Sequence, residues 1–196
     1  VPLMIEAVQA SGLKRGTQPG PVQVIAVTGG KGGVGKTSVS VNMATALASI
    51  GRRVLLLDGD LGLANVDVFL GLSPRHTMAH VLSGERTLDE IIIEAPQGFH
   101  VVPGASGVAE LANLSAAGHL GLVQAFSALS SRIDTMIVDT SAGISHSVVQ
   151  FTQAAQHVGL VVCDEPASMT DAYALAKVLS RGHGINTFRV VANMVR

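Results

Sequence analysis

Residues Val24 to Thr37 read VIAVTGGKGGVGKT. An apolar run breaks into a glycine-rich loop, and the loop ends in Lys-Thr at the start of a helix-forming segment. The residues from Gly30 to Thr37 match the G-x-x-x-x-G-K-[ST] pattern of a phosphate-binding loop (P-loop) without a mismatch. This strand–loop–helix context favours a nucleotide site over the alternative of a glycine-rich turn without a ligand.

The residue types of the loop explain why it is expected to hold phosphate. Glycine reaches backbone conformations closed to residues with a Cβ, so successive N–H groups can face one anion beside the N-terminus of the following helix. We expect Lys36 to reach the β- and γ-phosphates and Thr37 to ligate Mg²⁺. The predicted contacts to ATP or ADP come from Gly30, Lys31, Gly32, Gly33, Val34, Gly35, Lys36, Thr37 and Ser38.

A dinucleotide site is the main alternative on the same residues. Gly30, Gly32 and Gly35 also satisfy G-x-G-x-x-G, and Asp58 ends the next apolar run, where a ribose-binding acid belongs. That fingerprint gives no reason for Lys-Thr directly after the last glycine, nor for a second acid at Asp60. The sequence therefore favours Mg²⁺-dependent ATP binding over NAD binding.

Two further acids complete the predicted site. Asp139 ends an apolar run and precedes a turn of small residues, where a carboxylate suits Mg²⁺ bound directly or through water. The Gly143 amide in that turn is expected to sense the γ-phosphate. We expect Asp60 to orient or deprotonate the water that attacks this phosphate. The alternatives are a turn or capping role for Asp139 and a solvated loop position for Asp60. The predicted metal-site residues are Thr37, Asp60 and Asp139.

Composition limits the remaining functions. The chain has 196 residues, 47% of them apolar and 14% charged, which is typical of one globular domain. A net charge of −1 argues against broad electrostatic binding to DNA or to an acidic membrane, so we expect no direct DNA binding. Cys163 is the only cysteine, and no apolar run reaches transmembrane length; both features fit a cytoplasmic location.

The order of the predicted elements indicates an α/β fold. We expect strands over Val22–Thr28, Val54–Asp58, Phe99–Pro103, Thr135–Asp139, Val158–Cys163 and Thr187–Asn193. We expect helices over Lys36–Ile50, Thr77–Leu82, Leu88–Glu94, Ala116–Ser131, Ser145–Gln156 and Thr170–Arg181. Nearly continuous Val, Ile and Leu in the strands predicts a three-layer P-loop NTPase fold, with a mostly parallel sheet and helices on both faces. Residues 1–20 are expected to form an N-terminal tail and residues 21–196 the domain.

These residues resemble a known family. The loop with its early Lys31, the Asp58-x-Asp60 segment and Asp139–Gly143 are similar to the deviant-Walker-A ATPases of the MinD/ParA type. Within them, three further segments resemble the FleN/FlhG regulators of flagellar number: Leu61–Leu72, Val102–Gly107 and Val162–Leu175. The resemblance covers residues 22–196, almost the whole chain.

The resemblance implies roles for individual residues. Lys31 is expected to reach across a dimer interface to the partner's nucleotide and to supply charge there, as an arginine finger does. ATP would then hold a homodimer together, and slow hydrolysis to ADP and phosphate would release it. Asp60 and Asp139 match the water-positioning and Mg²⁺-associated acids, and Asn193 matches the adenine-recognising Asn. The catalytic residues implied are Lys31, Lys36 and Asp60.

The resemblance also implies partners and a cellular role. The family limits flagellar number and acts on an FlhF-type GTPase related to the signal recognition particle and on a flagellar master transcription regulator. The GTPase-activating helix matches Gln9–Arg15 in the tail, although Val8 stands where the motif normally begins with Asp. The family's C-terminal amphipathic helix, which recruits it to the inner membrane at the cell pole, would follow Arg196 and is absent from this chain. Gly59, where the family commonly has Ala, predicts a slightly looser loop.

Other functions on the same fold stay open at this point. Relatives that carry iron–sulfur clusters need cysteine pairs, which a single Cys163 cannot supply. A DNA-segregation ATPase would need a basic face, which this composition barely offers. Two alternatives remain: a nucleotide-gated binding module with negligible hydrolysis, and a MinD/ParA-type ATPase that positions another cellular cargo.

Overall fold

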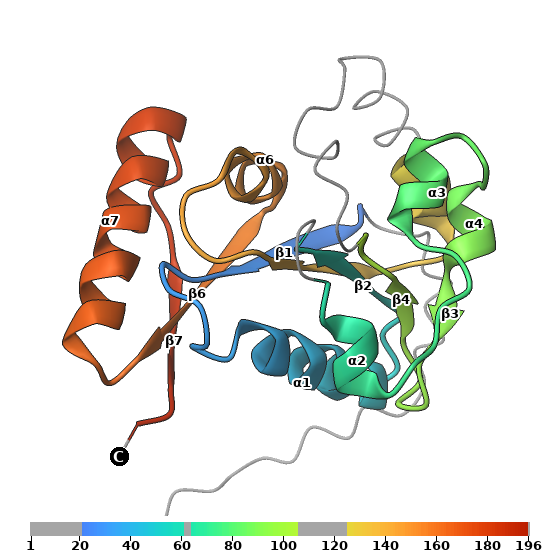
Figure 1. Ribbon diagram of the computed structural model, residues 1–196, viewed down its shortest axis with the longest axis horizontal. Helices are drawn as coiled ribbons and strands as arrows, with labels where there is room; N and C mark the ends of the chain where they lie inside the picture. Colours follow the sequence, from blue (N-terminus) through green and yellow to red (C-terminus); the bar gives the residue numbers. More distant parts are fainter. Residues whose placement is uncertain (1–20, 61–63, 106–124, 196) are drawn as a thin grey trace, which may run out of the picture.

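The strands form a sheet with the P-loop near its middle. The computed structural model describes residues 21–60, 64–105 and 125–195. Its strands are β1 (Gln23–Thr28), β2 (Val54–Gly59), β3 (Ile93–Glu94), β4 (His100–Val102), β5 (Thr135–Thr140), β6 (His157–Cys163) and β7 (Arg189–Asn193). Within the described residues they form one seven-stranded sheet in the order β3-β4-β2-β5-β1-β6-β7 (Figure 1). Every neighbouring pair in it is parallel except β3 and β4, which confirms the predicted mostly parallel sheet.

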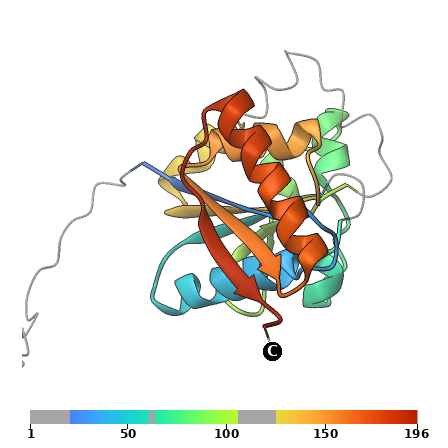
Figure 2. The ribbon, with the colours of Figure 1, turned by 90° about the vertical axis from the view of Figure 1, so that its left-hand side faces the viewer.

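Helices cover both faces of this sheet. They are α1 (Lys36–Ser49), α2 (Val66–Leu70), α3 (Met78–Leu82), α4 (Leu88–Ile91), α6 (His146–Ala154), α7 (Pro166–His183) and the short 3₁₀ helix η2 (Leu129–Ser131). In Figure 1, α1 and α2 lie below the sheet and α6 lies above it. Figure 2 turns α7 and β7 toward the viewer and shows α7 lying over β6, the strand that it contacts. The three-layer arrangement is therefore as predicted.

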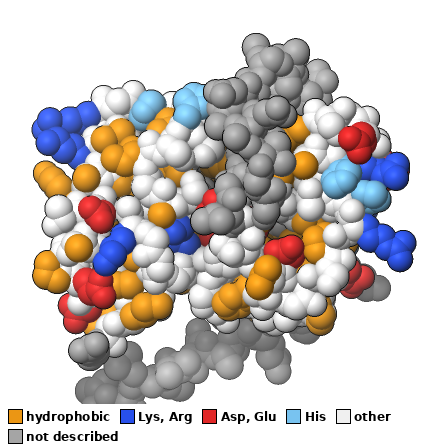
Figure 3. Space-filling model, viewed as in Figure 1, with side chains coloured by type: hydrophobic (Ala, Val, Ile, Leu, Met, Phe, Trp, Pro, Cys, Tyr) orange, Lys and Arg blue, Asp and Glu red, His pale blue; other side chains and the backbone are white. Residues whose placement is uncertain are grey.

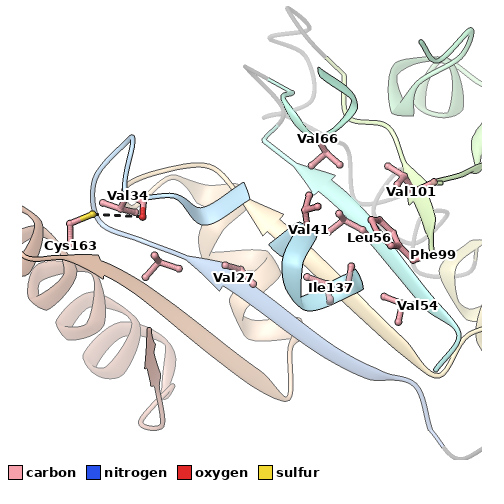
Figure 4. Close-up of a cluster of buried hydrophobic side chains, with 13 residues drawn as sticks. Val27, Val34, Val41, Val54, Leu56, Val66, Phe99, Val101, Ile137 and Cys163 are labelled. Atoms are coloured by element: carbon pink, nitrogen blue, oxygen red, sulfur yellow. Dashed lines mark hydrogen bonds between the residues drawn. The ribbon is translucent and has the colours of Figure 1, made fainter. Parts of the chain in front are cut away.

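The core explains why the central strands are so apolar. All residues of β2 and β5 are buried, because helices pack against both faces of these strands. On the α1 face, Val41 from the helix packs with Leu56 and Ile137 from the sheet (Figure 4). On the other face, α6, α7 and β6 share a second cluster of buried aliphatic side chains. The central strands β2 and β5 thus need apolar side chains on both sides.

Parallel pairing brings three functional segments to one edge of the sheet. β1 lies between β5 and β6, and β5 lies between β2 and β1. Asp58 pairs with Asp139 across β2 and β5, and Val27 pairs with Asp139 across β1 and β5. Because the carboxyl ends of parallel strands share an edge, the P-loop and both strand-end acids lie together there.

The segment predicted as a helix over Leu88–Glu94 is only half helical. α4 ends at Ile91, Ile92 is extended (φ −66°, ψ 131°), and β3 follows as an antiparallel neighbour of β4. Thr87 and Glu90 form a capping box that fixes the start of α4. The run of three isoleucines favours extended backbone beyond it, because β-branched side chains fit strands better than helices.

Two other helices differ from expectation. α2 lies in a segment for which the sequence predicted neither a helix nor a strand, since five residues are too few for a helical period to show. α7 begins at Pro166 rather than Thr170, because proline fits the first turn of a helix, where its missing N–H costs nothing. Neither difference alters the order of the layers.

Some predictions fall outside the described residues. The tail over residues 1–20 and the proposed GTPase-activating helix within it lie there, as does most of the helix predicted over Ala116–Ser131. Of that helix, the described part is helical over residues 125–128 and continues into η2. Among the described residues, none of the helices combines the length and the apolar character needed to span a membrane.

Candidate nucleotide-binding site

The P-loop connects β1 to α1 and leaves the start of that helix open. Gly35 precedes α1 in the left-handed conformation (φ 88°), and Gly33 is also left-handed (φ 78°), so glycine is required at both positions. The N-terminus of α1 has no side-chain cap and no acidic residue in its first turn. Its first N–H groups therefore lack the usual side-chain acceptors and suit a bound anion.

The base of the loop is packed tightly while its tip is open. A Cβ on Gly30 would lie 2.2 Å from the backbone carbon of Asp171 in α7, and so would overlap it. A Cβ on Gly32 or Gly33 would have no heavy atom within 4 Å. Glycine thus allows close packing at Gly30, whereas a side chain at Gly32 or Gly33 would project into open space.

This difference gives a prediction on stability. Gly30→Ala should lower the free energy of unfolding by about 1–3 kcal/mol, because α7 or the loop must move to admit the methyl group. Gly32→Ala is the matched control and should change that free energy by less than about 0.5 kcal/mol. Urea unfolding of the nucleotide-free proteins measures both values. Equal effects of the two substitutions would show that the contact with α7 is not what requires Gly30.

Side chains from β6 and β7 contact the backbone of the P-loop at Val34. The Asn193 side-chain amide donates to the Val34 carbonyl (2.9 Å), and the Cys163 thiol lies 3.7 Å from the same oxygen (Figure 4). Val34 itself is buried in the α1-side core. The structure therefore places Asn193, the predicted adenine-recognising residue, at the P-loop, where it also fixes the loop backbone.

Thr37 and Asp139, two of the predicted metal-site residues, are in direct contact. The Thr37 hydroxyl donates to Asp139 Oδ2 (2.6 Å), and the buried Ser40 hydroxyl lies 3.0 Å from Oδ1 of the same carboxylate. Burial raises the pKa of Asp139, against the lowering effect of these hydrogen bonds. Ser40 was not among the predicted site residues; its position one turn after Lys36 on α1 is the signal that could have found it.

Lys36 and Asp60 lie close enough to Asp139 for their charges to interact. Burial lowers the pKa of the Lys36 ammonium, while the charges of Asp139 and Asp60 oppose that change. The charge of Asp60 in turn raises the pKa of Asp139. Fold and register thus bring together Lys36, Thr37, Asp60 and Asp139, four residues that come from three separate segments of the sequence.

Asp58 is buried beneath this group. It is 1% exposed, and its two oxygens accept hydrogen bonds from the N–H groups of Asp60 (3.2 Å), Asn65 (2.8 Å) and Val66 (3.0 Å). Burial raises the pKa of its carboxyl from 3.8 to about 7. A carboxylate engaged in this way is not presented to a ribose, which counts against the dinucleotide alternative.

The raised pKa of Asp58 predicts a pH dependence of stability. The folded protein holds this proton more tightly than the unfolded chain, in which the carboxyl titrates near 3.8. Its contribution to stability is therefore full below about pH 4 and is lost as the pH rises through about 7. Over that interval the unfolding equilibrium constant of the native protein should rise relative to that of Asp58→Asn by up to about tenfold per pH unit. Urea unfolding across this range checks it; a pH-independent difference between the two proteins would contradict it.

The position of Gly59 is closely surrounded by neighbouring atoms. A Cβ there would lie 3.0 Å from both the Asp139 carbonyl oxygen and Val138 Cγ1, and 3.1 Å from Phe151 Cε2. Phe151 from α6 occupies the space beside this position. The expectation that glycine loosens the loop here is therefore not supported by the packing.

Lys31 points to a residue of its own chain. Its ammonium lies 2.8 Å from Glu165 Oε2, with side chains 42% and 61% exposed. The hydrogen bond to Glu165 raises the pKa of Lys31 and lowers that of Glu165. Exposed ion pairs of this kind contribute little to stability, so Lys31 can leave Glu165 at small cost. Glu165 is a contact that sequence reasoning did not anticipate.

Gly143 links the turn after β5 to the P-loop. Its N–H donates to the Gly29 carbonyl (3.1 Å), and its φ of 85° requires glycine. The predicted γ-phosphate sensor thus lies at the base of the loop. A movement of this turn would break a hydrogen bond to the P-loop itself.

The donor set fits Mg²⁺ in its chemistry. Hydroxyl and carboxylate oxygens are the ligands that Mg²⁺ prefers, and Thr37 and Asp139 place two of them 2.6 Å apart. Within residues 21–60, 64–105 and 125–195, no group of three or more His, Cys, Asp or Glu side chains is arranged to hold a metal. Nucleotide sites bind Mg²⁺ through few protein ligands, with phosphate and water completing the shell.

The chain is similar in sequence to known nucleotide-binding and flagellar proteins. The family model described as "AAA domain" matches residues 22–183. The antiactivator FleN of Pseudomonas aeruginosa is 62% identical over 174 residues, which cover 89% of this chain and 62% of FleN. The flagellum site-determining protein YlxH of Helicobacter pylori is 39% identical over 176 residues, covering 90% of this chain and 59% of YlxH. The chain thus spans about three fifths of the length of these curated relatives.

A solved structure shares the same fold. The septum site-determining protein MinD of Pyrococcus horikoshii, in complex with Mg-ADP, matches with a TM-score of 0.68 and 26% sequence identity. The match covers 86% of this chain and 68% of that chain. The shared fold therefore extends over most of this chain.

Proposed function

The chain belongs to the AAA-domain family of P-loop ATPases, among the FleN/FlhG and MinD-like proteins, and on this basis we propose that it binds and hydrolyses ATP as a dimeric switch. One observation carries the proposal most directly. The open P-loop stands at the uncapped start of α1, with Lys36, Thr37, Asp60 and Asp139 gathered at the same edge of the sheet. These are the groups that transfer of a phosphoryl group to water requires.

Each side chain has a distinct task in this proposal. Lys36, partly withdrawn from water, places a positive charge against the β- and γ-phosphates. Thr37 and Asp139 would hold Mg²⁺, which when bound neutralises phosphate charge. Asp60 orients the attacking water, and the amides at the start of α1 bind the phosphate oxygens. The match to a MinD solved with Mg-ADP supports the choice of nucleotide and metal.

The surface around the site supports assembly of two subunits. Ile144, next to Gly143, is 47% exposed, and Met169 in the first turn of α7 is 51% exposed. Both residues belong to segments that contact the P-loop region, one through Gly143 and one through Glu165. An ATP-dependent homodimer would bury these apolar side chains and bring Lys31 to the partner's nucleotide.

The relatives suggest the cellular role. FleN is an antiactivator and YlxH determines a flagellum site, so we infer that this chain regulates flagellar number, placement and gene expression. Its partners would be an FlhF-type GTPase and a flagellar master transcription regulator. On the face seen in Figure 3, Lys and Arg side chains are interspersed with acidic and apolar ones, which supports action through proteins rather than DNA. We place the protein in the cytoplasm and propose that it is recruited from there to the inner membrane at the cell pole.

Molecular mass in solution tests the switch. The protein is sized with Mg-ADP and with a non-hydrolysable ATP analogue, and multiple-turnover phosphate release is measured in parallel. We expect a monomer with ADP, a dimer with the analogue, and slow turnover with ATP. A dimer without turnover would support a nucleotide-gated binding module. A monomer in both states would contradict the dimeric switch.

A further inference from the structure

The carboxylate of Asp58 joins two parts of the backbone, one just after β2 and one at the start of α2. One oxygen accepts from Asp60 N–H at 3.2 Å. The other accepts from Asn65 N–H at 2.8 Å and from Val66 N–H at 3.0 Å. Asp60 follows β2, and Val66 begins α2, so a single side chain connects the end of a strand with the start of the next helix.

Such a contact is strong because the group is buried. A carboxylate withdrawn from water is costly unless its oxygens accept hydrogen bonds, and bonds to a charged acceptor are about twice as strong as neutral ones. Asp58 is 1% exposed. Its three backbone donors therefore offset part of a large desolvation cost, and in this buried place water could not easily replace them.

The chain at Gly104 packs against the Asp58 side chain and restricts its movement. A Cβ on Gly104, which follows β4, would lie 3.0 Å from Asp58 Cγ and 2.9 Å from Ala64 Cβ. The chain after β4 thus approaches Asp58 so closely that only glycine fits without a shift. On β5, Asp139 is the register partner of Asp58. Asp58 consequently has little freedom to move relative to the Mg²⁺-associated acid.

We propose that Asp58 is a positioning residue for ATP hydrolysis, which sets the place of Asp60 by holding the backbone at Asp60 and at Asn65–Val66. It acts through Asp60, because its carboxylate oxygens are engaged with backbone N–H groups. The inference rests on the proposed ATPase function. It assigns Asp58 a task different from the ribose contact that a strand-end acid performs in dinucleotide sites.

The test compares two acid-to-amide substitutions in the native chain. Asp58→Asn keeps the size of the side chain but leaves only one acceptor oxygen. Asp67→Asn is the matched control, because the carboxylate of Asp67 accepts from the N–H of its neighbour Val68 (2.8 Å), within α2. Asp58→Asn should lower kcat by about 10- to 100-fold, with the equilibrium Kd for the ATP analogue changed less than about threefold. Asp67→Asn should leave both near the native values.

A second readout does not depend on catalysis. Amide hydrogen exchange at Asn65 and Val66 in the nucleotide-free protein should be faster by about tenfold or more in Asp58→Asn, and unchanged in Asp67→Asn. Gly104→Ala, which presses on the carboxylate from β4, should give the same loss of kcat and covers the case in which Asp58→Asn fails to fold. If the unsubstituted protein hydrolyses ATP and both Asp58→Asn and Gly104→Ala keep its kcat, the inference is overturned. An inactive native protein would instead overturn the proposed function, and unchanged exchange in Asp58→Asn would still contradict the backbone contact.

Discussion

Replacing Lys31 by alanine is expected to lower the rate of ATP hydrolysis by about 10³- to 10⁵-fold, the range that an arginine finger supplies. The side chain stands at the start of the P-loop, is 42% exposed, and pairs with an exposed acid of its own chain at a distance of 2.8 Å. It can therefore leave Glu165 and approach a nucleotide bound to a second subunit. Steady-state phosphate release at saturating ATP measures the effect.

Two controls separate this role from simple loss of charge. Glu165→Ala removes the ion pair but keeps the lysine, so turnover should be retained. Lys177→Ala removes an exposed lysine of α7 that follows Asp171, the residue packed against Gly30, by six positions, and turnover should again be native. If Lys31→Ala hydrolyses ATP at the native rate, the lysine has no part in the reaction. If Glu165→Ala is as inactive as Lys31→Ala, the intrachain pair rather than a contact between subunits is what matters.

Asp60→Ala is expected to lower turnover by about 10²- to 10⁴-fold, the usual contribution of a positioned acid or base. Nucleotide binding should persist, because the P-loop, Lys36 and Thr37 are unchanged. The dimer formed with ATP should therefore live longer than that of the native protein. Phosphate release, together with equilibrium binding of the ATP analogue, measures the two effects separately.

The matched control for Asp60 is Asp67→Ala. Asp67 is a nearby acid at the start of α2, and it should tolerate the change without loss of turnover. Native hydrolysis by Asp60→Ala with normal binding would remove the residue from the mechanism. A loss of nucleotide binding in Asp60→Ala would show that it acts in affinity rather than in the chemical step.

Local sequence patterns predicted most of the fold. The glycine-rich loop, the helix from Lys36 and the buried strands depend on neighbouring residues, so their signals are present in short windows. The meeting of Thr37 with Asp139 was also predictable, since parallel strands that end in functional residues share an edge. Sequence motifs therefore predict which residues come together at this edge of the sheet, and their roles there stay predictions.

The contacts that sequence patterns did not predict depend on packing between segments that lie far apart in the sequence. Ser40 carries no motif, and its contact with Asp139 follows only from the packing of α1 on β5. The three hydrogen bonds of Asp58 need α2, a helix too short to show a period. Glu165 reaches Lys31 across 134 positions of sequence, and the requirement for Gly30 arises from the backbone of α7. None of these contacts is encoded locally.

A mixing experiment tests most directly whether one site is built from two subunits. Equal amounts of Lys31→Ala and Asp60→Ala are combined with ATP. In a mixed dimer, the site that keeps its own Asp60 receives Lys31 from the other subunit, while the second site lacks both. Random pairing should therefore restore about a quarter of native turnover, although each variant alone is nearly inactive. A mixture no more active than the sum of the two variants would contradict the shared site.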